Sequence, residues 1–330
     1  DGTAKIIIKG GSFINYDPSD SASENPRGNF CAPGYVAVKN DATENPVWTV
    51  EDHRVAEVEG TGYTTLASAI AEADGKTVTL LKDVTESVVI PAGKTMTLDL
   101  NGHKLVNSAT PQNEAVAKEN RKHTITNNGT LTIQDSVGNG VVDNVSHQCA
   151  ALYNNGTISE IKGGKFMRSV DNSTDATSSK GNSWYVVYNA DGATISKISD
   201  GEFLALGHFS SLFCNSGTIG EICGGTFTQD GFIAFKNEGT VNKISGGLFS
   251  SKNESCIQNW GTIGEISGGT ITAGRLGIWN FSSDNYSAPG RVNKISGGTI
   301  AGTTAAIHLT NYDVVYEEKS ADSVNTKAFI

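Results

Sequence analysis

Aromatic residues beside two polar insertions are the part of this 330-residue chain that could bind a ligand. The insertions cover residues 172–183 and 281–289. An aromatic side chain offers a flat apolar ring with a polar edge, which suits stacking on a sugar. The candidate ligand-binding residues are Trp184, Tyr185, Trp279, Phe281 and Tyr286, with Trp260 nearby. They predict a glycan-binding surface, or alternatively rings that only pack each loop onto the body of the protein.

The charged residues form no catalytic pattern in the sequence. Acid–base or calcium chemistry on a repetitive β protein needs acidic side chains on neighbouring strands. The outward positions after each Gly-Gly pair carry mostly Thr and Leu. Asp200, Glu202 and the insertion acids Asp171 and Asp175 could gather, or they remain solvated loop charges. The six histidines lack metal-ligand spacing, and no Ser/His/Asp or Cys/His pattern is visible. No catalytic residue, metal or cofactor is therefore predicted.

A sequence repeat carries these residues. The motif Asn-x-Gly-Thr-Ile, followed by Gly-Gly and a large apolar residue, recurs along the chain. Its basic interval is about 22 residues, as between the motif glycines Gly217, Gly239 and Gly261. Self-similarity at this interval is typical of solenoids. A leucine-rich repeat has a similar length, but its leucines and helical turn are missing here. Short β-rich runs broken at Asn-x-Gly and Gly-Gly corners leave no room for a helix.

The repeat predicts an all-β fold, a right-handed parallel β-helix with coils of about 22 residues. Apolar residues at helical spacing within residues 63–73, ended by Asp74 and Gly75, predict a short N-terminal capping helix over the first coil. Three regions are expected. Residues 1–52 are a coil half and tail that belong structurally to the end of a preceding module, residues 53–106 are the N-terminal cap and first coils, and residues 107–330 are repetitive coils with an incomplete last coil.

Two columns of residues should stack from coil to coil. Side-chain amides that repeat at one corner can bond to each other and to the turn backbone. The amide column is Asn154, Asn189, Asn215, Asn237, Asn259 and Asn280. A second column alternates in sign: Glu160, Lys197, Glu221, Lys243, Glu265 and Lys294. Such alternation is expected of vertical neighbours, since like charges directly opposite repel. Exposed pairs contribute only about 0.2–1 kcal/mol each, so the column should fix register more than stability.

The composition excludes some partners. A net charge of −10 without a basic patch argues against nucleic acid and anionic membranes as partners. No apolar run is long enough for membrane insertion. The five cysteines are odd in number and lack CxxC spacing, which favours buried free thiols over a disulfide framework.

A resemblance to a known family begins in residues 61–105, which read TGYTTLASAIAEADGKTVTLLKDVTESVVIPAGKTMTLDLNGHKL. This segment resembles the N-terminal cap of pectin-lyase-like β-helix proteins. The repeats, with GGSFINYDPSD and APGYVAVKNDATENPVWTV in residues 10–50, resemble repetitive surface proteins of Gram-positive gut bacteria. The resemblance covers nearly the whole chain and implies an extracellular, adhesin-like module of the bacterial cell surface without a defined activity. Polysaccharide lyases and glycoside hydrolases share the fold, so an enzyme remains an alternative that fold alone does not establish.

The two ends of the sequence complement each other. Residues 306–311 match residues 232–237, but the rest of that last coil does not follow, whereas residues 1–13 (DGTAKIIIKGGSF) contain it. We expect residues 1–13 to complete the last coil of the preceding copy, either within a tandem array or by strand addition in a head-to-tail fibre. The predicted assembly residues are Ile6, Ile7, Ile8, Phe13, Ile307, Leu309 and Asn311. The alternative is that residues 1–50 fold back on their own chain. The sequence thus favours a non-enzymatic structural or adhesive module whose partners are further copies of itself.

Overall fold

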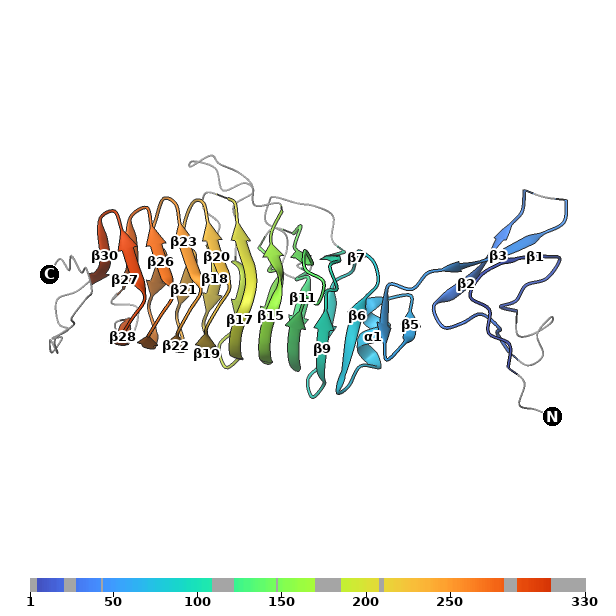
Figure 1. Cartoon of the computed structure of the whole chain (residues 1–330), viewed down its shortest axis with the longest axis horizontal. Helices are drawn as coiled ribbons and strands as arrows, with labels where there is room; N and C mark the ends of the chain where they lie inside the picture. Colours follow the sequence, from blue (N-terminus) through green and yellow to red (C-terminus); the bar gives the residue numbers. More distant parts are fainter. Residues whose placement is uncertain are drawn as a thin grey trace.

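The computed structural model describes residues 5–20, 28–42, 44–108, 122–146, 148–169, 185–207, 211–281 and 290–309. Across these ranges the chain forms a rod of stacked β-coils, and a small antiparallel sheet lies beyond one end of the rod (Figure 1). Successive coils pair in parallel along the rod. The prediction of an all-β parallel β-helix is confirmed.

One side of the rod is a parallel sheet of nine strands within the described residues. In chain order these are β8 (Val88–Ile90), β11 (Ile125–Asn127), β14 (Leu152–Asn154), β16 (Tyr185–Asn189), β18 (Ser211–Asn215), β21 (Phe235–Asn237), β24 (Ile257–Asn259), β27 (Leu276–Asn280) and β30 (Ala305–Leu309). From β11 to β27 each strand ends at the Asn of the repeat. The Asn corner is therefore where the chain leaves this sheet.

The rest of the rod wall belongs to a second sheet, which holds 18 strands in the described ranges. The strands that follow the Asn corner, and β9 before them, are β9 (Thr95–Asp99), β12 (Thr130–Gln134), β15 (Thr157–Met167), β17 (Thr194–Ala205), β19 (Thr218–Ile222), β22 (Thr240–Ile244), β25 (Thr262–Ile266) and β28 (Arg291–Ile295). The remaining side is formed by β7 (Val84–Thr85), β10 (Lys104–Val106), β13 (Val141–Asp143), β20 (Thr226–Gln229), β23 (Leu248–Ser251), β26 (Thr270–Ala273) and β29 (Thr299–Gly302).

Two strands are longer than the sequence predicts. A break at every Gly-Gly corner is wrong for β15, and β17 likewise continues through the equivalent Asp200–Gly201 corner. Their pairing slips between Ile161 and Lys162 and again between Lys162 and Lys165. These irregularities bend the strands around the corner while ladder bonding continues.

The repeated apolar residues fill the interior of the rod. Ile219, Ile222 and Phe227 are fully buried, as are their counterparts one coil further along. Phenylalanines from four coils form a stacked column with ring centroids 5.2, 4.6 and 4.4 Å apart; they are Phe166, Phe203, Phe227 and Phe249. Each coil therefore buries its apolar side chains against those of its two neighbours.

The predicted amide column is confirmed and begins one coil earlier, at Asn127. From Asn127 to Asn259, each Asn side chain donates to the amide oxygen of the next coil at 2.7–2.8 Å, and Asn280 accepts the last of these bonds. Most also donate to a backbone carbonyl beyond it, as Asn237 does to Thr262 at 3.2 Å. The glycine of the corner is required by close approach, because a Cβ on Gly239 would lie 2.0 Å from the carbonyl oxygen of Gly217.

The alternating charges are also vertical neighbours. Glu221 lies opposite Lys197 and Lys243, and Glu265 lies opposite Lys243 and Lys294. The Lys294 ammonium is 2.8 Å from Glu265. At the other end of the column, Lys197 is 3.5 Å from Glu160. Serines add to the column, since the Ser245 hydroxyl donates to Glu221 at 2.6 Å and the Ser296 hydroxyl to Glu265 at 2.7 Å.

One end of the rod is covered by α1 (Leu66–Ala71) with β4 (Ala56–Val58), β5 (Thr61–Tyr63) and β6 (Lys76–Leu80). The predicted helical spacing is correct, because Leu66, Ala69 and Ile70 are buried on the first coil. Thr65 caps the helix by accepting from the Ser68 amide. The Glu86 carboxylate accepts from the first amide of the helix at 2.7 Å. This end of the hydrophobic core is therefore closed.

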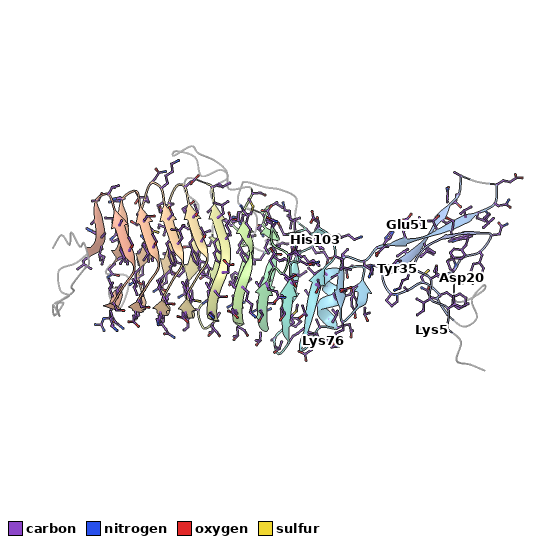
Figure 2. All side chains as sticks on the ribbon, viewed as in Figure 1. Lys5, Asp20, Tyr35, Glu51, Lys76 and His103 are labelled. Atoms are coloured by element: carbon purple, nitrogen blue, oxygen red, sulfur yellow. The ribbon has the colours of Figure 1, made fainter. Side chains whose placement is uncertain are left out.

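The small sheet consists of β1 (Ser12–Ile14), β2 (Tyr35–Asn40) and β3 (Val47–Asp52), with β3 in the centre. Figure 2 shows Tyr35 and Glu51 on this sheet, away from Lys76 and His103 on the first coils. In the single chain β1 is antiparallel to β3, with Phe13 opposite Trp48. This matches the alternative in which residues 1–50 fold back, because β3 offers β1 a strand edge of its own chain. Completion of another copy's coil remains a prediction.

The Asn ladder predicts a large loss of stability for Asn237→Ala. The substitution leaves the Asn215 side-chain amide with only the Thr240 carbonyl as acceptor and the Asn259 side-chain carbonyl without its donor, and both groups are buried. A buried unsatisfied group costs about 1–3 kcal/mol, so the free energy of unfolding should fall by about 2 kcal/mol or more. Denaturant unfolding measures the change. The exposed Asn155 serves as the control, and an equal effect of Asn155→Ala would show that the ladder adds no stability.

Candidate functional site

Three of the five predicted aromatic residues are described, and they lie on the outer surface of the nine-stranded sheet. Tyr185 begins β16, Trp279 is in β27, and Phe281 follows that strand. Trp184 and Tyr286 lie outside the described residues. Four coil steps separate β16 from β27, which corresponds to about 19 Å along the rod. The structure therefore places Trp279 and Phe281 together and Tyr185 apart from them.

Sequence reasoning missed most of the column to which Trp279 belongs. The column consists of the residues directly before the repeat Asn and their counterpart in β30: Thr126, Tyr153, Tyr188, Cys214, Lys236, Gln258, Trp279 and His308. The signal was present in the sequence, because residues on one face of a strand alternate and the Asn side chain points inward. The residue before each Asn must therefore face outward.

The rings of this surface contact one another along the rod. His123 stacks on Tyr153 at 4.4 Å between centroids, and Tyr153 stacks on Tyr188 at 5.4 Å. Near the far end Trp260 stacks on Phe281 at 3.9 Å. Trp279 meets Phe281 edge-on at 5.0 Å and His308 edge-on at 6.3 Å. Rings of neighbouring coils therefore cover much of one another's surface, and the contacts of Trp279 with Phe281 and His308 are edge-on.

A polar cluster separates the two groups of rings. The Ser216 hydroxyl donates to the Glu238 carboxylate at 2.9 Å, and Lys236 forms an ion pair with Glu238 at 2.6 Å. The Lys236 ammonium also lies 5.2 Å from the centre of the Trp260 ring. Burial raises the pKa of Glu238, but the hydrogen bond and charge of Lys236 outweigh it and hold that pKa below its usual value. The cluster is therefore charged but internally neutralised.

The prediction of buried thiols holds for three of the five cysteines, whereas Cys31 and Cys223 are half-buried. All five are free, and Cys149, Cys214 and Cys256 are buried. Burial, reinforced by the nearby Glu238 carboxylate, raises the pKa of the Cys214 thiol to about 12. A thiol with such a pKa stays protonated at neutral pH and is a poor nucleophile.

A groove of about 540 Å³ lies at the Gly-Gly corners of the irregular coils. It brings together Asp200 and Glu202, as one reading of the sequence expects, with Lys162 and Lys165 beside them. Lys165 forms an ion pair with Glu202 at 2.8 Å. Asp135, also in the groove, accepts from the amides of Gly102 and Gly140 at 2.7 Å each. The acids are therefore engaged by lysines and backbone, an arrangement that supports the corner.

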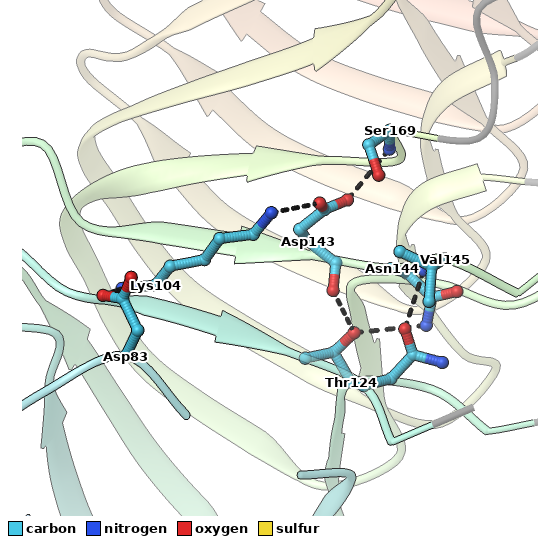
Figure 3. A network of polar contacts seen from close by, with 8 residues as sticks. Asp83, Lys104, Thr124, Asp143, Asn144, Val145 and Ser169 are labelled. Atoms are coloured by element: carbon cyan, nitrogen blue, oxygen red, sulfur yellow. Dashed lines mark hydrogen bonds and ion pairs between the residues drawn. The ribbon is translucent and has the colours of Figure 1, made fainter. Parts of the chain in front are cut away.

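A second charged network ties coils together near the start of the rod (Figure 3). The buried Asp143 carboxylate lies 2.8 Å from the Lys104 ammonium and accepts from the Ser169 amide at 2.9 Å. The Thr124 hydroxyl donates to the Asp143 carbonyl at 2.7 Å, and Asn144 donates to that hydroxyl. The bonds of Asp143 to Lys104 and Ser169 join neighbouring coils, whereas those of Thr124 connect the start and the end of its own coil.

Two classes of site are not found in the described part of the chain. No group of three or more His, Cys, Asp or Glu side chains in it is placed to hold a metal ion. None of its helices has the length and apolar character needed to cross a bilayer.

The predicted assembly residues lie at the two extremes of the molecule. Ile6 and Ile7 expose 61% and 53% of their surface, whereas Ile8 bridges to Cys31 and Phe13 lies in β1. Ile307 and Leu309 are in β30, at the opposite end of the rod (Figure 1). Asn311 lies outside the described residues. A single chain does not bring the two groups together.

The lowered pKa of Glu238 predicts a dependence of stability on pH. A depressed carboxyl pKa adds stability above the unfolded-state pKa of about 4.3, and this stability is lost as the pH falls through the folded-state pKa. Glu238→Gln should therefore lose less stability than the natural chain between pH 7 and pH 3. Melting temperatures at both pH values test this, with the exposed Glu72→Gln as control. Equal losses in all three proteins would contradict the assignment.

Comparison with known proteins identifies no relative: no model of a protein family matches the chain, and neither the curated proteins nor the solved structures show a significant similarity to it.

Proposed function

We propose that the protein is a structural or adhesive β-helix module that joins copies of itself head to tail. Residues 1–13 of one copy complete the last coil of the preceding copy, either between subunits of a fibre or within a tandem array. The proposed location is the surface of a bacterium, outside the cell. The sequence resemblance to Gram-positive surface proteins supports that location. The geometry of the two ends supports the joining of copies.

The observation that carries the proposal is a change in core burial at the last described coil. Three core isoleucines of the preceding coil are fully buried: Ile266, Ile271 and Ile278. Their counterparts one coil further along are only partly buried: Ile295, Ile300 and Ile307. We call these last three residues the open end. An apolar end of this kind gains free energy when another coil is added, at about 25 cal/mol for each Å² buried.

The opposite end supplies a segment with the missing pattern. Gly10, Gly11 and Phe13 reproduce the Gly-Gly-x-Phe of the repeat, and Ile6 and Ile7 precede them. Joining requires β1 to leave its antiparallel pairing with β3, in which Phe13 lies opposite Trp48. Exposed isoleucines on a segment with strand character are suited to strand addition, in which main-chain bonds supply affinity and side chains supply specificity. Because the two contacting surfaces differ, repeated joining gives an open filament.

The proposal assigns no catalytic activity. In the groove, Glu202 is paired with Lys165, and both Asp135 oxygens accept from backbone amides. A general acid or base needs a carboxyl group that can exchange its proton with a substrate. A polysaccharide lyase or glycoside hydrolase remains the competing class, and release of unsaturated or reducing sugars would support it.

Glycan binding is a second candidate, favoured by Trp279. This ring is half-buried on the outer surface of the rod and meets Phe281 and His308 edge-on. If it stacks on sugars, Trp279→Ala should weaken binding to a responsive glycan by about tenfold, since aromatic stacking contributes about 0.5–1.5 kcal/mol beyond the area it buries. A glycan array followed by calorimetry measures this, with Val89→Ala on the same sheet as control. Unchanged affinity would remove Trp279 from any glycan site.

Assembly is tested by changing the exposed isoleucines without deleting β1. Ile6→Asp combined with Ile7→Asp should prevent self-association, because two carboxylates would enter the apolar joint. Sedimentation velocity and negative-stain microscopy should show long particles for the natural chain and single rods for the variant. Val137→Asp places a charge at another exposed apolar residue and should behave like the natural chain. Single rods in all three samples would leave only the tandem-array form of the proposal.

A further inference from the structure

Four Asn-Gly pairs occur in the sequence, and each is a place where the chain can react with itself. They are Asn101-Gly102, Asn128-Gly129, Asn139-Gly140 and Asn155-Gly156. In such a pair the glycine nitrogen attacks the side-chain carbon Cγ of the asparagine, because glycine has no side chain that hinders the approach. The Cγ–Nδ2 bond breaks, ammonia leaves and a five-membered succinimide ring forms. Water then opens the ring to aspartate or to isoaspartate.

The first condition for this reaction is an asparagine side chain that is able to turn toward the following nitrogen. Two of the four asparagines are half-buried, and the Asn101 amide is held by a bond to the Leu80 carbonyl at 2.8 Å. The other half-buried residue, Asn128, accepts from Asn155 at 3.4 Å, a bond too long to restrain the exposed Asn155 strongly. Asn139 is exposed as well. The condition is therefore met best at Asn139 and Asn155.

The second condition is a glycine nitrogen that leaves its hydrogen-bond acceptor and loses its proton. The Gly140 amide donates to the Asp135 carboxylate at 2.7 Å. The Gly156 amide donates to the Asn154 side-chain oxygen at 3.3 Å. A short bond to a carboxylate is stronger than a long bond to a neutral amide. A negative charge beside the nitrogen also opposes removal of its proton. Of the two glycine nitrogens, that of Gly140 is therefore held more firmly.

A second bond fixes the Asp135 carboxylate in this position. Its other oxygen accepts from the Gly102 amide at 2.7 Å. Because β9 pairs with β12 and β10 with β13, the two glycines lie on neighbouring coils. One carboxylate therefore holds the glycine nitrogens of two Asn-Gly pairs. The asparagines of both pairs have a positive φ, 50° for Asn101 and 69° for Asn139, which asparagine tolerates in tight turns.

We propose that Asn155 is a site of spontaneous deamidation and that Asp135 protects Asn139 from the same reaction. The proposal is independent of the assembly of copies. It gives an acidic residue of the groove a chemical role toward its own chain, since the carboxylate holds the reacting nitrogen in place.

Deamidation at Asn155 affects the corner between β14 and β15. The product adds a negative charge there, and isoaspartate also adds one atom to the backbone. The Asn155 amide donates to the Asn127 carbonyl of the preceding coil at 2.8 Å, and the adjoining Asn154 belongs to the buried amide column. An extra backbone atom does not fit this in-register corner. The modification therefore weakens the stack at one defined coil.

Peptide mapping by mass spectrometry tests the proposal on the full-length folded chain during incubation at mildly alkaline pH. Deamidation replaces an NH₂ group by OH, and the mass change locates it in the sequence. We expect Asn155 to be modified first and Asn139 at least about tenfold more slowly, because the bond to a charged acceptor must break before the attack. The chain unfolded in denaturant should be modified at all four pairs, since the acceptors are then lost.

Asp135→Ala removes the acceptor and should raise the rate at Asn139 by about tenfold, while the rate at Asn155 stays unchanged. Glu202→Ala is the matched control, because it removes another carboxylate of the same groove and should change neither rate. Asn155 on the next coil is the internal reference for folding, since general loosening raises both rates together.

Three results would overturn the proposal. In the natural folded chain, modification of Asn139 as fast as that of Asn155 would show that Asp135 gives no protection. An equal rise at both sites in Asp135→Ala would show that the residue acts only on overall stability. An Asn155 that stays unmodified while the unfolded chain reacts at all four pairs would remove it as a modification site.

Discussion

In-register stacking of coils about 4.8 Å apart is the constraint on which the rest of this structure depends. Each residue of a coil meets the same position of the next coil, so a residue type is acceptable only if it tolerates its own kind or alternates with a complementary type. Asn satisfies the first condition, because its amide both donates and accepts, and the buried column bonds at 2.7–2.8 Å. Glu and Lys satisfy the second condition by alternating.

The same constraint makes the two ends of the rod the least satisfied parts of the molecule. In a stack of identical coils, the last coil always leaves a strand edge and one side of its apolar core layer uncovered. Further coils could be added to it. At one end α1 resolves this by burying Leu66 and Ile70 on the first coil. At the other end Ile300 and Ile307 are left partly exposed in the last described coil. Several charges on the walls of the rod are paired with each other, whereas the isoleucines of the last described coil are not fully covered.

Much of this architecture could be predicted from the sequence, because stacked positions must carry compatible residues and the sequence therefore repeats. The Asn column, the charge column and the helix around Ile70 followed from spacing alone, since each depends on local pattern and identical neighbours. The antiparallel pairing of β1 did not, because Gly10, Gly11 and Phe13 also fit a coil, and pattern does not say which strand edge lies nearest. The Tyr153 and Tyr188 stack was missed for another reason: the residue before each Asn varies in type, so it shows no repeat.

On the outer aromatic surface, a ring can have a structural role between coils without binding a ligand. Rings in one column lie close enough to stack on each other, as Tyr153 does on Tyr188, and stacking of this kind stabilises neighbouring coils without any ligand. A sugar would have to replace part of that contact or find a ring held edge-on, which singles out Trp279. Residues that alternate or repeat down a column are explained by the stack itself. A binding role is best sought where a column is interrupted or where the stack ends.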